Sequence, residues 1–283
     1  MGFRICVLAS GSGGNCTLIQ SAACRILIDA GLSGRETARR LEQVGLAIED
    51  IDAILVGHEH GDHVRGLDVL ARKHRRPIFM NRGTAEAVDR PRGGSWEIRI
   101  FTTGQAWTLG DLNITPFPVF HDALEPVGFS IRREETTVVI ATDLGMPTTV
   151  VKDKIRSARV VVMEANHDPV LLMNGNRPWS LKQRIRGTQG HLANEDAADL
   201  LASETGDDLS DIFLAHLSQD CNRPDLALGA VKNRLKERGR AHVRVWLTYP
   251  DRISEVVEIG EAAPSPLRPA PARSSSQLSL PGL

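Results

Sequence analysis

The stretch that decides the fold is GHEHGDHVRGL, residues 57–67. It directly follows an apolar run, IDAILV (51–56), and it brings three imidazoles and one carboxylate together in the chain: His58, His60, Asp62 and His63. A strand that ends in a tight loop lets neighbouring side chains converge on one point, and imidazoles with a carboxylate are ligands that suit zinc or manganese. A solvated loop that is histidine-rich by chance is the alternative, and it leaves the preceding buried strand unexplained. The stretch therefore predicts a site for divalent metal ions.

Hydrophobic periodicity places this loop in a chain that alternates short strands with helices. Apolar or β-branched runs predict strands at residues 17–21, 25–31, 51–58, 77–81, 160–166 and 211–218. Helical spacing and helix-start signals predict helices at residues 34–46, 64–74, 84–90, 194–204 and 225–239. The segments between residues 97 and 143 are expected to form a run of antiparallel strands. Strand-rich halves, each followed by helices, predict an α/β fold with two stacked layers.

Composition excludes several classes of protein. The chain has 283 residues and a formal net charge of -1, which gives no global argument for binding nucleic acid or a membrane. Its four cysteines form no C-x-x-C pair, and its N-terminus has no signal-peptide pattern. No apolar run approaches the roughly 20 residues that span a bilayer. We therefore expect a cytoplasmic protein whose basic surface, if any, is local.

One local basic segment does occur, at residues 169–194, and it contains no acid. It carries four cationic side chains and one large aromatic: Arg177, Lys182, Arg184, Arg186 and Trp179. Cations bind phosphates in a salt-dependent way without reading sequence, and a Trp can stack on a base. A solvated loop with a packed Trp is the alternative. We expect this segment to be a loop that binds a polyanionic substrate.

The stretch SGSGGNC (10–16) follows an apolar strand and raises the question of a nucleotide-binding loop. Such a loop needs a helix behind its glycines, because the helix N-terminus supplies the amides that bind phosphate. Here another strand follows, and the lysine of a phosphate-binding loop is missing. The glycines therefore join strand to strand.

The window from His58 to His63 resembles the H-x-H-x-D-H signature of the metallo-β-lactamase fold, and the resemblance extends over residues 1–260. It implies a single catalytic domain, built as a four-layer αββα sandwich with two divalent metal ions at one edge of the two sheets. The implied ligands form two sets with a bridge between them: His58, His60 and His121; Asp62, His63 and His216; and Asp143 as the bridge. Asp29 is the implied aspartate that supports the metal loop.

Motifs that occur in order along the chain carry a closer resemblance: SGSGGNC, LIDAGLS, GHEHGDHVRGL, FHDALEPVGFSI, ATDLG, EANHD, GHLAN and LAHLSQDCN. Together they look like the YycJ/WalJ group of the fold, whose members are regarded as metal-dependent nucleases. The resemblance implies a phosphodiesterase that acts as a 5′-to-3′ DNA exonuclease in DNA repair or replication. The glycine turn would lie beside the metals, where Ser10, Ser12 and Asn15 are expected to contact a substrate phosphate. A turn that only packs there is the alternative.

Phosphodiester hydrolysis needs a group that gives a proton to the leaving oxygen. His191 in GHLAN is the preferred candidate and His167 in EANHD the second. Glu164 and Asp168 flank His167 and are expected to orient it. Asp62 is expected to be catalytic as well as a ligand. The alternative for His191 is a structural role at the start of the helix that follows.

Two other classes of function use the same ligands. A lactonase-like or thioesterase-like hydrolase of small substrates would favour a short or apolar segment at residues 169–194, which is instead long and basic. A metal-binding regulatory protein without turnover is the second class. It would not need the complete set of ligands that the sequence provides.

Residues 261–283 differ from the rest of the chain, because proline, serine and alanine dominate and little can be buried. We expect a disordered tail. Its end, QLSLPGL (277–283), resembles the peptide that docks on the bacterial DNA polymerase sliding clamp, although a Pro-Gly pair stands where a bulkier run is usual. The implied anchors are Gln277, Leu278, Leu280 and Leu283. A chain end without a partner is the alternative.

Overall fold

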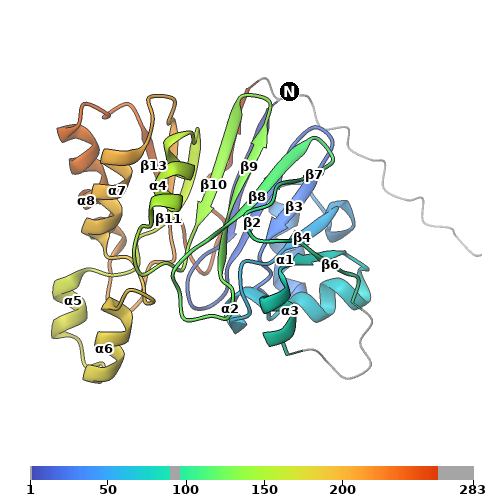
Figure 1. Ribbon diagram of the computed structural model, residues 1–283, viewed down its shortest axis with the longest axis horizontal. Helices are drawn as coiled ribbons and strands as arrows, with labels where there is room; N and C mark the ends of the chain where they lie inside the picture. The colour runs from blue at the N-terminus through green and yellow to red at the C-terminus, as the bar shows by residue number, and fades with distance from the viewer. Residues whose placement is uncertain (1, 90–95, 261–283) are drawn as a thin grey trace, which may run out of the picture.

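Two seven-stranded sheets lie face to face in the computed structural model, which describes residues 2–89 and 96–260 (Figure 1). The first sheet has the strand order β14-β1-β2-β3-β4-β5-β6. Its strands are β1 (Phe3–Ala9), β2 (Cys16–Gln20), β3 (Arg25–Ile28), β4 (Ala53–Leu55), β5 (Ile78–Met80), β6 (Ile98–Ile100) and β14 (Val257–Ile259). Strands β3 to β6 run parallel, whereas β14, β1, β2 and β3 form antiparallel pairs. The expected tail, residues 261–283, lies outside the described residues.

The second sheet has the order β13-β12-β11-β10-β9-β8-β7 and the same division into two halves. Its strands are β7 (Trp107–Leu109), β8 (Leu112–Pro118), β9 (Val127–Arg133), β10 (Thr136–Ala141), β11 (Val160–Glu164), β12 (Asp211–Ala215) and β13 (Arg244–Leu247). Strands β7 to β10 form an antiparallel meander, and β10 to β13 run parallel.

Helices cover the outer faces of the sheets and complete the expected four-layer sandwich (Figure 1). On the side of the first sheet lie α1 (Gly34–Gln43), α2 (Gly61–Val64), α3 (Arg82–Ala87), a 3₁₀ turn (Ile48–Asp50) and a π-helical turn (Val69–Lys73). On the second sheet lie α4 (Thr149–Arg156), α7 (Asn194–Glu204) and α8 (Pro224–Glu237). Beyond α7 and α8, at one end of the molecule, lie α5 (Pro169–Asn174) and α6 (Trp179–Arg186). Within residues 2–89 and 96–260, no helix combines the length and the apolar character that crossing a membrane requires.

Strand β1 shows why these segments read as continuous apolar runs. Ile5 and Val7 face the core between the two sheets, while Cys6 and Leu8 face the core under the first layer of helices. Successive side chains of a strand point to opposite faces, so a strand that is covered on both faces needs apolar residues at every position.

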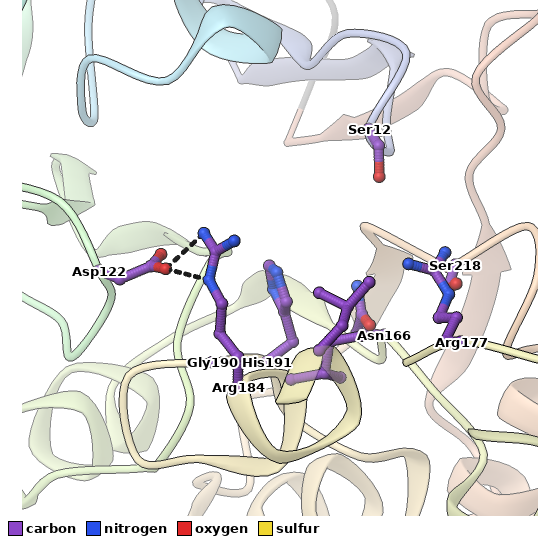
Figure 2. Close-up of a pocket in the computed structure, with 10 residues that line it drawn as sticks. Ser12, Asp122, Asn166, Arg177, Arg184, Gly190, His191 and Ser218 are labelled. Atoms are coloured by element: carbon purple, nitrogen blue, oxygen red, sulfur yellow. Dashed lines mark hydrogen bonds and ion pairs between the residues drawn. The ribbon is translucent and has the colours of Figure 1, made fainter. Parts of the chain in front are cut away.

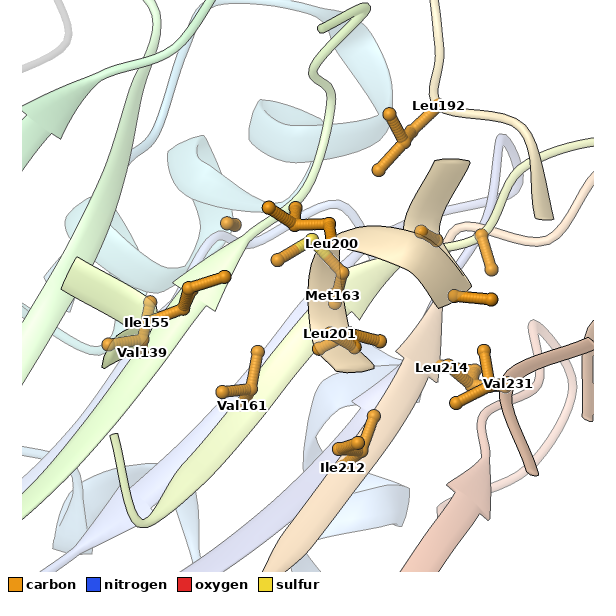
Figure 3. Close-up of a cluster of buried hydrophobic side chains, with 14 of the residues drawn as sticks. Val139, Ile155, Val161, Met163, Leu192, Leu200, Leu201, Ile212, Leu214 and Val231 are labelled. Carbon is orange, nitrogen blue, oxygen red and sulfur yellow. The ribbon is translucent and has the colours of Figure 1, made fainter. Parts of the chain in front are cut away.

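A third core lies between the second sheet and its helices (Figure 3). Met163 of β11 and Leu214 of β12 pack there with Leu201 of α7 and Val231 of α8, all of them fully buried. This core holds α7 against the carboxyl ends of β11 and β12. Those strand ends carry residues of the metal centre described below.

The structure corrects two expectations about secondary structure. Residues 97–102 were expected in the antiparallel run, but β6 pairs in parallel with β5 and extends the first sheet. The connection from β5 through α3 to β6 is a crossover, which joins parallel strands. Residues 169–194 were expected to be a loop, but they contain α5 and α6. Helix α6 spans only eight residues and buries none of them fully, so its apolar pair, Leu181 and Ile185, gives a short periodic signal.

Gly31, which follows β3, lies where three loops touch backbone to backbone. The Gly31 amide donates to the Asn15 carbonyl at 2.9 Å, and the Asn15 amide donates to the Asp62 carbonyl at 2.7 Å. A β-carbon at Gly31 would lie 1.6 Å from the Asp62 carbonyl oxygen and 2.5 Å from the Asn15 nitrogen. Glycine at position 31 is therefore required for the turn at residues 10–16 to approach the loop that follows β4.

We predict that Gly31→Ala destabilises the fold by about 3 kcal/mol or more, because the added methyl group must displace backbone on both sides. Gly229→Ala is the matched control, since Gly229 lies within α8 and a β-carbon there meets no atom within 4 Å. It should stabilise the protein by about 0.5–1 kcal/mol through the helix propensity of alanine. Urea denaturation measures both, and equal stability of the two variants would contradict the packing argument.

Candidate metal centre

The residues that the resemblance implies as ligands meet at one edge of the sandwich, where strands of both sheets end. His58 to His63 follow β4, His121 follows β8, Asp143 follows β10 and His216 follows β12. The donor atoms of His58, His60 and His121 lie within 4.8 Å of one another, and so do those of Asp62, His63 and His216. Asp143 belongs to two further groups of this kind, one with His58 and His63 and one with Glu164, His191 and His216. The fold thus brings all seven side chains together.

Three of the residues at these strand ends have backbone that side chains rarely adopt. Asp29 has φ 63°, Asp143 has φ 57° and His216 has φ 54°. Left-handed backbone at a non-glycine residue costs on the order of 1–3 kcal/mol and persists where the surroundings enforce it. Each of these residues lies within two positions of the end of its strand.

The first group consists of imidazoles alone. His58 Nε2 lies 3.0 Å from His60 Nδ1, so two ring nitrogens face each other without a carboxylate between them. His121 places Nδ1 at 3.1 Å from the Gly190 carbonyl oxygen, which accepts its proton, so Nε2, 3.3 Å from Asp122 Oδ1, is the nitrogen that could bind a metal. Burial lowers the pKa of His58 well below its usual value, and the neutral ring is the form that binds a metal.

The second group combines imidazoles with carboxylates. His63 Nδ1 lies 2.8 Å from Asp29 Oδ2, and His216 Nδ1 lies 2.9 Å from Glu164 Oε1. In each ring, Nδ1 therefore faces a supporting carboxylate and Nε2 faces the other carboxylates of the group. This arrangement is typical of metal-binding histidines. There, His63 Nε2 lies 3.2 Å from Asp143 Oδ2, and His216 Nε2 lies 3.4 Å from Asp62 Oδ2.

The donor set fits two divalent cations. Asp143 is 2% exposed, and its Oδ2 atom lies 3.2 Å from His63 Nε2 without the geometry of a hydrogen bond. Burial opposes ionisation, but the imidazoles of His216 and His63 hold the pKa of Asp143 well below its usual range. A buried carboxylate of this kind needs a positive partner, and oxygen and imidazole donors suit zinc and manganese alike.

Side chains of the turn at residues 10–16 form hydrogen bonds with residues of the second group. Ser10 Oγ accepts a hydrogen bond of 2.7 Å from the His216 amide, and Asn15 Nδ2 donates to Asp62 Oδ2 at 3.0 Å. Both side chains are buried. We expected Ser10, Ser12 and Asn15 to contact a phosphate. Of these, Ser12 lines a cavity beside His191, which is described below.

Glu164 holds two histidines at once, a role that the sequence interpretation missed. It is fully buried, and Oε1 lies 2.7 Å from His191 Nδ1 and 2.9 Å from His216 Nδ1. The expectation that Glu164 and Asp168 orient His167 was wrong. Asp168 instead caps α5 by accepting from the Leu171 amide at 2.8 Å. The sequence did contain a signal for this role of Glu164: an acidic residue at the end of an apolar strand. Asp143 was recognised by the same signal.

The two candidate proton donors differ in environment. Burial lowers the pKa of His191, but the charge and hydrogen bond of Glu164 outweigh this and raise it. Burial lowers the pKa of His167 to about 4, so that ring is neutral near pH 7. The His191 ring lies 5.1 Å from the rings of both His121 and His216. His191 is therefore the histidine that faces the metal-binding groups, and it also lines the neighbouring cavity.

That cavity has a volume of about 140 Å³ (Figure 2). Its wall is mostly polar: Ser12, Asp122, Asn166, Arg177, Leu181, Arg184, Ile185, Gly190, His191 and Ser218. The cationic side chains of residues 169–194 lie in two separate places. Arg177 and Arg184 line this cavity, whereas Trp179, Lys182 and Arg186 line a separate hollow with Met173.

Comparisons with known proteins agree with this geometry. Residues 24–207 match the family model described as beta-lactamase superfamily domain. The chain is 40% identical over 241 residues to exodeoxyribonuclease YycJ of Bacillus anthracis, covering 84% of this chain and 91% of that protein. It is 35% identical over 266 residues to exodeoxyribonuclease WalJ of Streptococcus pneumoniae serotype 2, covering 92% and 99%. The crystal structure of the metallo-beta-lactamase fold protein YhfI from Bacillus subtilis superposes with a TM-score of 0.70 at 17% identity, covering 92% of this chain and 100% of YhfI.

We predict that Asp29→Asn weakens metal binding about 10- to 100-fold while the protein stays folded. Asparagine tolerates left-handed backbone, and its oxygen can still accept from the Gly57 amide, which donates to Asp29 Oδ1 at 2.8 Å. Its NH₂ group then faces His63 Nδ1, so the ring proton moves to Nε2 and blocks that donor atom.

Chelator competition and metal content measure this effect. Asp52→Asn is the control, because Asp52 accepts from the Arg25 amide at the exposed start of β3 and lies away from the metal-binding groups. Equal metal affinity in Asp29→Asn and the parent protein would show that Asp29 does not support the ligand.

Proposed function

The chain belongs to the β-lactamase superfamily and, within it, to the YycJ/WalJ group, and from this premise we propose that it is a metal-dependent DNA exonuclease acting from 5′ to 3′. One observation carries the proposal. A cavity with two guanidinium groups, Arg177 and Arg184, opens beside His191 and the metal-binding groups. Guanidinium groups bind phosphate oxygens through paired hydrogen bonds, so this lining supports a substrate that carries phosphate groups.

The proposed ligands divide as the two groups do. His58, His60 and His121 would hold one cation, Asp62, His63 and His216 would hold the other, and Asp143 would contribute its carboxylate to both. Two such cations, when bound, supply a nucleophilic hydroxide near neutral pH and stabilise the attacking and leaving oxygens of a phosphodiester.

The protein's own residues provide the rest of the chemistry. His191 gives a proton to the leaving oxygen, since Glu164 holds its Nδ1 and leaves Nε2 for the substrate side. Ser12 and the two arginines position phosphate groups within the cavity. Trp179 and Lys182, in the separate hollow, contact the strand further from the scissile bond.

A hydrolase of small apolar substrates is the second candidate, and the cavity argues against it. Pockets for such ligands are lined mainly by apolar side chains and measure about 300–1,000 Å³. The cavity beside His191 is smaller, at about 140 Å³, and its wall is charged. A screen with lactones, lactams and thioesters tests this alternative directly.

The proposal includes recruitment to DNA in replication or repair through the end of the chain. Gln277, Leu278, Leu280 and Leu283 would enter the peptide groove of the sliding clamp. Residues 261–276 would act as the tether that raises the local concentration of the enzyme on DNA. The support for this step is the sequence resemblance alone.

We predict that Asp62→Ala with His63→Ala lowers hydrolysis of end-labelled DNA at least about a thousandfold, because metal ions supply several kcal/mol of transition-state stabilisation. A chelator should do the same to the parent protein. The control is Glu49→Ala with His74→Ala, which removes a carboxylate and imidazole 2.7 Å apart away from the site. Assays on DNA and RNA side by side define the substrate, and cleavage by the double ligand variant at the parental rate would refute the proposal.

We also predict that deletion of residues 277–283 abolishes binding to a purified bacterial sliding clamp, measured by surface plasmon resonance. Hydrolysis of short oligonucleotides should persist. Replacement of Ser274, Ser275 and Ser276 by alanine serves as the control in the same segment. Clamp binding that survives the deletion would remove this part of the proposal.

A further inference from the structure

The cavity beside His191 holds its two arginines in different ways. Arg184 Nε lies 2.6 Å from Asp122 Oδ2, and Asp122 Oδ1 lies 3.3 Å from His121 Nε2. This pair is therefore anchored at the side of the metal-binding groups. Arg177 Nη2 lies 2.6 Å from Asp220 Oδ2, and the Asp220 side chain is 73% exposed. Figure 2 shows the two arginines on opposite sides of His191.

A ligand that enters the cavity can replace Asp220 as the partner of Arg177. An ion pair with so exposed a partner contributes little, because water screens it and Asp220 can turn into solvent. In addition, the Arg177 Nε atom is buried and has no hydrogen-bond partner among the described residues. A buried donor of this kind is satisfied when an acceptor enters the cavity.

Serine hydroxyls add donors around the same space. Ser218 Oγ accepts from the Cys221 amide at 3.1 Å, which leaves its own proton available. Ser12 lies opposite, on the glycine turn, and points toward the cavity (Figure 2). The cavity therefore offers guanidinium and hydroxyl donors from three separate segments of the chain.

Size and charge identify the ligand. A volume of about 140 Å³ accommodates a compact group such as a phosphate. Each arginine already faces one carboxylate, so an internal phosphodiester, with one negative charge, gains little by entering. A phosphomonoester carries about 1.5 to 2 negative charges near pH 7 and three acceptor oxygens, so it competes better with Asp220.

We propose that the cavity formed by Arg177, Arg184 and Ser218 binds the terminal phosphomonoester of a DNA strand and thereby directs hydrolysis to strand ends. The inference rests on the proposed nuclease function and adds to it the feature of DNA that is recognised. Both a 5′-phosphate and a 3′-phosphate have this chemistry. The arms of the experiment distinguish them.

The test uses one oligonucleotide with three kinds of ends: a 5′-phosphate, a 3′-phosphate, or hydroxyls at both ends. We expect the full-length protein to hydrolyse one phosphorylated form with kcat/KM at least about tenfold above the hydroxyl form, as charge-assisted hydrogen bonds to phosphate predict. Arg177→Gln should reduce this ratio to below about threefold. Arg132→Gln, an exposed arginine near the far end of β9, should leave the ratio as it is.

A second variant gives a result that a merely structural role of Arg177 would not. Asp220→Asn removes the competing carboxylate, so the affinity for the preferred phosphorylated end should rise about threefold or more. Fluorescence anisotropy with the Asp62→Ala His63→Ala protein as background measures this affinity without hydrolysis.

The outcomes separate the two proposals. Hydrolysis of all three oligonucleotides with equal kcat/KM would overturn the inference and leave the nuclease intact. Absence of hydrolysis from the metal-loaded parent protein would refute the proposed function. In that case the anisotropy comparison of phosphate and hydroxyl ends decides whether the cavity binds a phosphomonoester, and equal affinities would overturn that too.

Discussion

The structure depends on one constraint: buried imidazoles and carboxylates from both sheets occupy the same few ångströms at the edge of the sandwich. Groups of this kind are costly to bury unless they are paired with opposite charge or bound to a cation. Asp143 shows the constraint most clearly, because it is nearly inaccessible and its two oxygens lie 3.2 Å from His63 Nε2 and 3.5 Å from His216 Nε2. The surrounding scaffold provides ligand geometry for cations that balance this charge.

Several features of the fold serve that scaffold. Glu164 and Asp29 each hold an imidazole from behind, and the glycine turn supports His216 and Asp62 from the side. The left-handed residues at three strand ends oppose stability, and the packed cores on both faces of the sheets offset them. The same strand ends therefore carry both the strained backbone and the proposed metal ligands.

Much of this arrangement could be predicted from the sequence, because most of the proposed ligands lie at the ends of apolar strands. His216 and Asp143 illustrate the rule, and α7 has the bounds that its pattern indicates. Contacts across the fold could not be predicted in the same way. The sequence places Glu164 beside His167, yet its Oε1 atom pairs with imidazoles 27 and 52 positions further along the chain. Helix α6 was missed because it spans only eight residues, over which periodicity gives a short signal.

The pairing of β14 with β1 has a consequence for how the molecule forms. Phe3 lies opposite Ile259 in the register of these strands, so the edge of the first sheet joins the two extremes of the described chain. Such a pairing has a very high contact order, and loop closure over that length opposes it until most other contacts exist. Strand β1 can pair with the neighbouring β2 early, but its pairing with β14 forms only after residues up to Ile259 have been synthesised. The sheet that carries the histidine loop is thus the last to acquire its full complement of neighbours.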